Sequence, residues 1–226
     1  MKIFNVATYE RDECLFRTID SIYNQADVIN VALNSHDVIP ENLINDPKIN
    51  CFLTNNSIGD GFKFLKLNES DGYYFTIDDD LIYPANYADY MIESFEKYHR
   101  KYIVTLHGRT FYNYPVESYY RSPHYNFRCL GDVETDVLVD FGGTGVMMFH
   151  TDLLKFSSED IKLPNMADIW VAKFAKEKGI KIACINHNSV FLKYQQEVGN
   201  DTIFDKHAYD DNLQTELVNK IGFKKA

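Results

Sequence analysis

Short runs of apolar and β-branched residues alternate along the chain with segments whose apolar residues recur at helical spacing. The runs predict strands over 2–9, 27–34, 48–53, 72–77, 101–106 and 180–185, and two more over 137–141 and 145–149. The helical spacing predicts helices over 12–23, 86–99, 166–178 and 213–221, and less clearly over 57–68. This alternation predicts an α/β fold with a mostly parallel central sheet flanked by helices on both faces.

Residues at the ends of these segments sharpen the prediction. Asp12 is expected to cap the first helix, and Gly179 and Gly222 to end the last two. Residues 107–135 interrupt the alternation with many tyrosines, prolines and arginines. Since no repeat or change of composition divides the sequence, residues 1–226 are expected to form a single domain.

Composition and charge exclude several classes of protein. The 226 residues are 45% hydrophobic, enough for a real core, and the net charge of −10 disfavours binding to nucleic acid or an anionic membrane without a bound cation. The four cysteines lie far apart in the sequence and form no C-x-x-C pair, which argues against a zinc site and a disulfide scaffold. No apolar run approaches the ~20 residues that cross a bilayer. The polar residues at 8–11 come too early for a signal peptide, so a cytoplasmic protein is expected. A position beside a membrane stays open.

Three consecutive acids, Asp78, Asp79 and Asp80, follow the predicted strand 72–77. Ligands of open α/β sheets gather at the carboxyl ends of strands, and adjacent carboxylates repel one another unless a cation or hydrogen-bond donors relieve them. Carboxylate oxygens suit Mg²⁺ or Mn²⁺. The alternative is a solvated turn in which one aspartate caps the helix after Pro84.

Five segments resemble the GT-A glycosyltransferases in their order along the chain, and specifically the inverting glycosyltransferase family 2 of bacterial polysaccharide synthesis. They are VATYERDE, NSIGDGFKF, GYYFTIDDDLIYP, DFGGTGVMMF and NMADIWVAKFAKEKGI, and together they span nearly the whole sequence. The acid triplet with its strand is the most specific of them. The chain departs from the commonest pattern at Ala7, where many members have proline, and at Ala167, where many have glutamate.

The resemblance implies roles for the acids. Asp80 would bind a Mn²⁺ or Mg²⁺ ion directly, Asp78 would bind the ion's water or the ribose, and Asp79 would orient its neighbours or touch the donor sugar. His187, after the strand 180–185, matches the place of a third metal ligand, although a lone histidine is more often structural. Asp168, in NMADIW, matches the general base; the alternative is an acid that only stabilises a helix N-terminus.

Nucleotide recognition is expected at the first strand ends. Thr8 and Arg11 are candidates for the base and the pyrophosphate, and Asn34 for the base edge, although each has an alternative as a cap or surface residue. Asp60 and Lys63 resemble family positions near the nucleotide, where Lys63 would meet phosphate or base; it is otherwise an ordinary surface lysine.

Two further stretches are assigned to the site. Gly143, Thr144 and Gly145 resemble the family's loop beside the donor sugar, where missing side chains make room, and the alternative is a tight turn. The aromatic stretch 107–128, with three arginines, is either an acceptor-facing loop or a hydrophobic cluster beneath a long loop. The segment 188–206 is a candidate lid.

These observations predict a metal-dependent glycosyltransferase that moves a sugar from a nucleoside diphosphate, most simply UDP, to a hydroxyl of a glycan or lipid-linked glycan, with inversion. A non-catalytic module that binds a sugar or nucleotide is the first alternative. A nucleotidyltransferase is the second, and the absence of glycine from VATYERDE disfavours it.

Overall fold

The computed structural model describes residues 1–195 and 210–223. In this part of the chain an eight-stranded sheet has the order β3-β2-β1-β4-β11-β6-β12-β9. Its strands are β1 (Lys2–Thr8), β2 (Val28–Asn34), β3 (Ile49–Thr54), β4 (Tyr73–Ile77), β6 (Tyr102–Thr105), β9 (Val137–Val139), β11 (Val146–His150) and β12 (Lys181–Cys184). Strands β1 to β4 pair in parallel, and among the eight only β11 and β9 run the other way. The predicted mostly parallel α/β architecture is confirmed.

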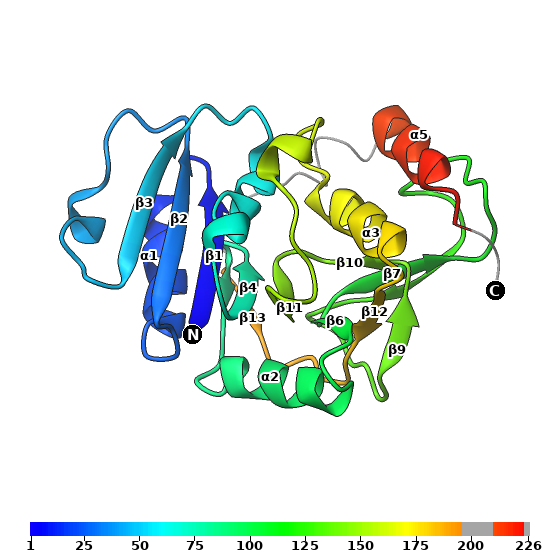
Figure 1. Ribbon diagram of the computed structural model, residues 1–226, viewed down its shortest axis with the longest axis horizontal. Coiled ribbons are helices and arrows are strands. Elements are labelled where there is room, and N and C mark those ends of the chain that lie inside the picture. Colours follow the sequence, from blue (N-terminus) through cyan, green and yellow to red (C-terminus); the bar gives the residue numbers. More distant parts are fainter. Residues whose placement is uncertain (196–209, 224–226) are drawn as a thin grey trace.

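Helices cover both faces of the sheet (Figure 1). They are α1 (Asp12–Ile22), α2 (Tyr87–Lys97), α3 (Ala167–Glu177) and α5 (Asn212–Ile221). Because side chains alternate along a strand, neighbouring residues belong to opposite cores. In β4, Phe75 packs with α1 and α2, whereas Tyr74 packs in the cluster that contains α3 and α5.

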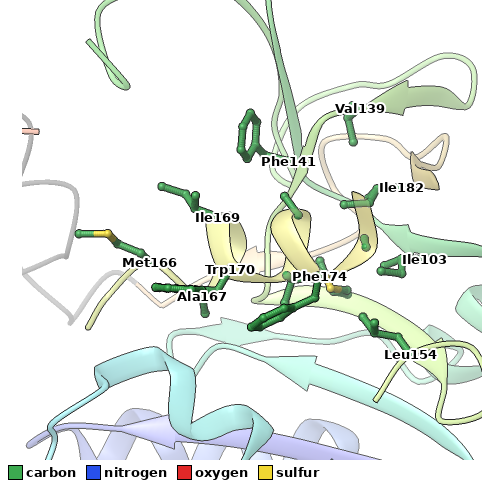
Figure 2. Packing of buried hydrophobic residues seen from close by; sticks show 14 of the residues in the cluster. Ile103, Val139, Phe141, Leu154, Met166, Ala167, Ile169, Trp170, Phe174 and Ile182 are labelled. Carbon is green, nitrogen blue, oxygen red and sulfur yellow. The ribbon is translucent and has the colours of Figure 1, made fainter. Parts of the chain in front are cut away.

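Helix α3 is apolar over most of its surface, which explains why it is buried in the hydrophobic cluster that contains Tyr74. Figure 2 shows Ile169, Trp170 and Phe174 extending from this helix among Phe141, Ile182 and Leu154. The helix begins at Ala167, which is fully buried. Core packing therefore fixes the position of the next residue, Asp168.

Two small sheets and four 3₁₀ helices complete the described structure. Strands β7 (Gly108–Phe111), β8 (His124–Phe127) and β10 (Phe141–Gly142) form one sheet, and β5 (Leu81–Ile82) pairs with β13 (Lys193–Tyr194) in the other. The 3₁₀ helices are η1 (Glu41–Leu43), η2 (Gly59–Phe64), η3 (Leu67–Glu69) and η4 (Ser158–Asp160). Among the described residues, no helix reaches the length and apolar character needed to cross a membrane.

Several local predictions were wrong. Residues 57–68 form the two short helices η2 and η3 instead of one α-helix, and the interrupted stretch 107–135 contains the β7–β8 hairpin. The predicted strand 137–141 divides into β9 and β10, and Leu138 at the sheet edge is half exposed. Asp12 is the first residue of α1 and not its cap; its Oδ1 lies 2.8 Å from His36 Nε2.

Candidate functional site

The carboxyl ends of β1, β2, β3 and β4 lie at one edge of the sheet, since these strands are parallel. Asp78, Asp79 and Asp80 leave the sheet there, directly after β4. Thr8 ends the neighbouring strand β1, and Arg11 follows it. The edge therefore brings together the acid triplet and two of the predicted nucleotide-binding residues.

Asp79 is the structural anchor of the triplet. Its side chain is buried, Thr8 Oγ1 donates a hydrogen bond to its Oδ2 at 2.6 Å, and Arg11 Nη1 lies 3.5 Å from its Oδ1. Burial raises the pKa of Asp79, and the Thr8 hydroxyl and the Arg11 guanidinium oppose that effect. The Thr8 hydroxyl, predicted to contact a nucleotide, is thus engaged in holding Asp79.

Asp80 is surrounded mainly by the charges of Asp78, Asp79 and Arg11. Arg11 Nη1 lies 3.5 Å from its Oδ2, longer than a charge-assisted hydrogen bond of about 2.8 Å. Burial, followed by the carboxylates of Asp78 and Asp79, raises the pKa of Asp80 to about 7. Compensation of its negative charge within the described chain is therefore incomplete.

Asp78 is the most exposed of the three, with 42% of its side chain accessible. Lys63 Nζ, whose side chain is 3% exposed, donates to its Oδ1. A Cβ atom on Gly145 would stand 1.8 Å from Asp78 Oδ2, so the carboxylate occupies the space that this glycine leaves. Gly145 therefore makes room for a protein carboxylate, whereas the sequence analysis assigned that space to a donor sugar.

Lys63 is a buried counter-ion and not a surface lysine. Burial works to lower its pKa, but Asp78 and Asp60 raise it above the ordinary value. Asp60, in turn, accepts a hydrogen bond of 3.3 Å at each carboxylate oxygen from the N–H of Ala167. Burial raises the pKa of Asp60 to about 7, against the opposing effect of Lys63. Lys63 thus forms an ion pair with Asp78 and acts on Asp60 through its charge, and Asp60 in turn bonds the first residue of α3.

Asp168 lies at the start of α3, one residue beyond that contact. Its Oδ1 accepts from the N–H of Ile169 at 2.9 Å, and its Oδ2 accepts from the hydroxyl of Tyr119 at 2.7 Å. Asp168 and Asp60 also interact electrostatically. The predicted base and the predicted metal ligands therefore belong to one connected polar cluster.

Asn34, predicted to contact the edge of a nucleotide base, instead forms hydrogen bonds within the protein. Asn34 is buried; its Nδ2 donates to the carbonyl of Gly59 at 3.3 Å, and its Oδ1 accepts from Thr54 Oγ1 at 2.5 Å. This amide links the end of β3 to η2. Its predicted use at a nucleotide base edge is not supported, because both groups of the amide are engaged within the protein.

The loop 143–145 closes one side of the triplet. Gly143 N–H donates to the carbonyl of His107 at 2.8 Å, and a Cβ there would stand 2.8 Å from His107 Cβ. Thr144 between the two glycines is buried. Burial lowers the pKa of His107 to about 4, so this ring adds no positive charge at neutral pH.

His187 is not placed as a ligand. The ring is buried, with Nδ1 at 2.8 Å from the carbonyl oxygen of Ile185 and Nε2 at 3.1 Å from that of Arg128. A metal ligand needs a ring nitrogen lone pair directed at the ion. Both ring nitrogens face backbone carbonyls in this structure, which does not support His187 as the third ligand, and its ligand role stays a prediction.

Sequence reasoning missed three residues whose hydrogen bonds fix the turn that holds the acid triplet. Tyr83 donates to the carbonyl of Gly145 at 2.6 Å and accepts from the N–H of Asp78 at 2.9 Å. Thr18 Oγ1 lies 3.0 Å from the Asp79 carbonyl oxygen, and the N–H of Gln195 donates to that of Asp80 at 2.9 Å. No local sequence pattern predicts these hydrogen bonds. Those of Thr18 and Gln195 depend on which elements the fold brings together.

The predicted lid 188–206 is described only as far as residue 195. That part pairs through β13 with β5 and buries Gln195, whose Nε2 donates to Thr18 Oγ1 at 2.9 Å. Residues 196–206 lie outside the described residues. Within the aromatic stretch, Phe111 and Tyr119 are buried, whereas Tyr112 and Tyr125 are exposed and pack against one another with tilted rings, 4.6 Å between centroids.

The donor set suits a hard divalent cation. Asp78 and Asp80 offer carboxylate oxygens. Burial, and after it the charges of Asp78 and Asp79, raises the pKa of Asp80, and a bound cation would oppose both effects. Within residues 1–195 and 210–223, no three histidine, cysteine, aspartate or glutamate side chains gather as a complete metal site. The fit is therefore that of an ion held by two carboxylates together with oxygens from water or substrate phosphates, which is how Mg²⁺ is usually bound.

No protein-family model matches the sequence, and no curated protein matches it significantly. The residues and their geometry therefore carry the functional argument alone.

Proposed function

We propose that the chain is a metal-dependent glycosyltransferase of the GT-A type that transfers a sugar from a nucleoside diphosphate, most simply UDP, to a hydroxyl of a glycan. One observation carries the proposal. The acid triplet lies at the carboxyl edge of a mostly parallel sheet and is connected through Lys63 and Asp60 to the helix that bears Asp168. Ligands of such sheets bind at this edge.

Asp80 and Asp78 would hold a Mg²⁺ or Mn²⁺ ion. When bound, such an ion supplies Lewis-acid stabilisation for a departing diphosphate. The protein's own residues supply the frame: Thr8 and Arg11 fix Asp79, and Lys63 and Gly145 fix Asp78. Nucleotide binding is assigned to the surface beside Arg11 and the loop 143–145.

Asp168 would act as the general base. Its carboxylate accepts the proton of the acceptor hydroxyl while that oxygen forms a bond to the anomeric carbon and the bond from this carbon to the diphosphate oxygen breaks. A single displacement of this kind inverts the anomeric configuration. The partial exposure of Asp168 leaves it accessible to an acceptor.

The first test is calorimetric titration of UDP, GDP, CDP and dTDP into the protein with and without Mn²⁺. The matched variants are Asp80→Asn and, as control, Asp152→Asn; Asp152 follows the antiparallel strand β11 at the opposite edge of the sheet, with a side chain 81% exposed. We expect one nucleotide to bind in a Mn²⁺-dependent manner, to the control as to the wild type, and Asp80→Asn to abolish binding. Failure of all four nucleotides to bind folded protein would refute the proposal.

A second test separates a transferase from a binding module with the same fold. Asp168→Asn should retain binding of the nucleotide that the first titration selects and lose turnover of its sugar conjugates. If the wild type binds the nucleotide but releases none from any conjugate, the chain is a binding module. Retention of turnover in Asp168→Asn would remove this residue from the base position.

A further inference from the structure

We propose that Tyr119 is a positioning residue for Asp168, and that Arg109 holds Tyr119 in place. The inference rests on the proposed function, because it assigns to Asp168 the role of base. Tyr119 lies between β7 and β8, 49 residues before Asp168, and its hydroxyl donates to Asp168 Oδ2 at 2.7 Å.

The tyrosine is built into the core and does not lie on a mobile surface. It is 4% exposed, and its ring packs against Phe111 and Phe141 with centroid distances of 5.9 and 6.1 Å. Its N–H donates to Thr215 Oγ1 of α5 at 2.9 Å. The hydroxyl therefore reaches Asp168 from a fixed frame.

Arg109 of β7 fixes the same residue in two ways. Its guanidinium carbon lies 4.5 Å from the centroid of the Tyr119 ring, within the range of a cation–π interaction. Its Nη1 also donates to the carbonyl oxygen of Tyr119 at 2.8 Å. This arginine thus engages the backbone and the ring of the residue that holds Asp168.

The hydroxyl of Tyr119 acts as a donor toward Asp168. Burial, and after it the negative charge of Asp168, raises the pKa of Tyr119 well above its ordinary value, so the phenol stays protonated at neutral pH. The carboxylate then receives one hydrogen bond at each oxygen, from Ile169 N–H and from Tyr119. Each oxygen retains a further lone pair for a substrate hydroxyl.

Two donors on two oxygens restrict rotation of the carboxylate, which is what a base needs in order to meet a proton at hydrogen-bonding distance. With Tyr119 changed, the Ile169 N–H would be the one hydrogen-bond donor left on the Asp168 carboxylate among the described residues. The expected consequence is slower chemistry with little change in donor binding, since Tyr119 does not contact the acid triplet in any hydrogen bond or ion pair given for the described chain.

The chain offers a matched control. Tyr114 donates to Asp140 Oδ2 at 2.8 Å, so it is a second tyrosine bound to a carboxylate in the same loop region. Its ring packs on Phe111 and Phe223, away from Asp168. Tyr119→Phe and Tyr114→Phe each remove one such hydrogen bond and keep the ring, so similar losses of thermal stability are expected.

The experiment measures UDP release from UDP-glucose, UDP-galactose and UDP-N-acetylglucosamine with Mn²⁺, where water takes the place of the acceptor. For Tyr119→Phe we expect kcat to fall by about 10- to 100-fold, the size of a lost hydrogen bond to a charged group, with KM for the donor within about twofold. Tyr114→Phe should keep kcat within about twofold of the wild type. Arg109→Lys, which loosens Tyr119 without removing its hydroxyl, should lower kcat by less.

The outcomes separate the two proposals. If the wild type releases UDP and Tyr119→Phe matches Tyr114→Phe in kcat, the positioning role is refuted and the proposed function stands. A rise in KM equal to the fall in kcat would indicate a general structural role and would also refute it. If the wild type releases no UDP from these three sugars, the same assay is run with sugar conjugates of the nucleotide that the calorimetric titration selects; if no conjugate releases its nucleotide, the transferase proposal and this inference fail together.

Discussion

Replacing Lys63 by methionine removes the buried cation that lies between Asp78 and Asp60, and the structure gives the size of the effect. The methionine keeps the apolar stem of the side chain, so the change isolates the charge. Removing one partner of a fully buried ion pair costs about 3–5 kcal/mol. Here Asp78 is 42% exposed, and Asp60 can keep its proton at a cost of about 1.4 kcal/mol for the one pH unit between its pKa of about 7 and pH 8, so we expect a loss of about 2–3 kcal/mol at pH 8.

The loss should depend on pH because of Asp60. Its pKa is about 7 in the folded protein against an ordinary value of 3.8, a difference of roughly 3 units. At about 1.4 kcal/mol per unit, ionising Asp60 in the folded state costs at most about 4 kcal/mol. A carboxyl group whose folded pKa is raised stabilises the protein less as pH rises from its unfolded pKa through its folded pKa.

At pH 5 the folded wild type and the folded variant both carry protonated Asp60, so only Asp78 loses its partner. Asp78 is 42% exposed and can be hydrated, which limits the loss there to about 1 kcal/mol. At pH 8 the wild type carries ionised Asp60 beside Lys63, whereas the variant must ionise it without a cation or keep the proton against the solution pH. The destabilisation should therefore be larger at pH 8 than at pH 5.

Urea unfolding at both pH values measures the two free energies directly, provided that the slope with denaturant is unchanged. Lys173→Met is the control: Lys173 pairs with Glu177 at 2.7 Å on the surface of α3, and its replacement should cost within about 0.5 kcal/mol. A loss for Lys63→Met below about 1 kcal/mol at pH 8, or equal losses at both pH values, would show that Lys63 is not the counter-ion of this cluster.

Three further substitutions test other parts of the structure. Gly145→Ala places a Cβ 1.8 Å from Asp78 Oδ2 and should destabilise the protein by about 1–3 kcal/mol, whereas Gly131→Ala, whose Cβ meets nothing closer than 3.4 Å, should not; thermal melting compares them. Asn30→Ala breaks the chain of amides on β1, β2 and β3 and should cost about 1–3 kcal/mol in urea unfolding; an unchanged midpoint would show the chain to be dispensable. Thr18→Val removes the hydroxyl that lies 3.0 Å from the Asp79 carbonyl, and should weaken Mn²⁺-dependent nucleotide binding in calorimetry; equal affinity would show that the turn does not need it.

The elements around the central sheet were predictable because the strands are short apolar runs and the helices carry apolar residues at helical spacing. The strand predicted over 72–77 is β4 at Tyr73–Ile77, and the helix over 166–178 is α3 at Ala167–Glu177. The β7–β8 hairpin was not predictable in the same way. Strand β8 reads HYNF and has no buried residue; its polar and aromatic positions alternate over four residues only, within a stretch rich in tyrosines, which is too short a pattern to mark a strand.

The site was predictable only as far as the position of strand ends allows. That rule placed Asp78 to Asp80 next to Thr8 and Arg11, and the structure brings these residues together. The position of strand ends gives no information on hydrogen-bond partners that lie far away in the sequence. Tyr119 precedes Asp168 by 49 residues, and Gln195 follows Thr18 by 177. Such pairs depend on tertiary packing, and a single sequence carries no signal for them.

The distribution of charge within the site indicates where a cation would act. Lys63 neutralises Asp78 at close range, and the Thr8 hydroxyl with Arg11 holds Asp79. Among the described residues, the ion pair of Asp80 is with the Arg11 guanidinium at 3.5 Å, and its pKa of about 7 shows that burial and its two acidic neighbours outweigh the opposing charges of Arg11 and Lys63. A divalent ion would therefore gain most from contact with Asp80 and from the exposed side of Asp78, since the other carboxylate of the triplet is already served by donors of the protein. The fold thus compensates Asp78 and Asp79 with its own donors and leaves the charge of Asp80 the least compensated of the three, which supports the proposed cation site at the carboxyl ends of the strands.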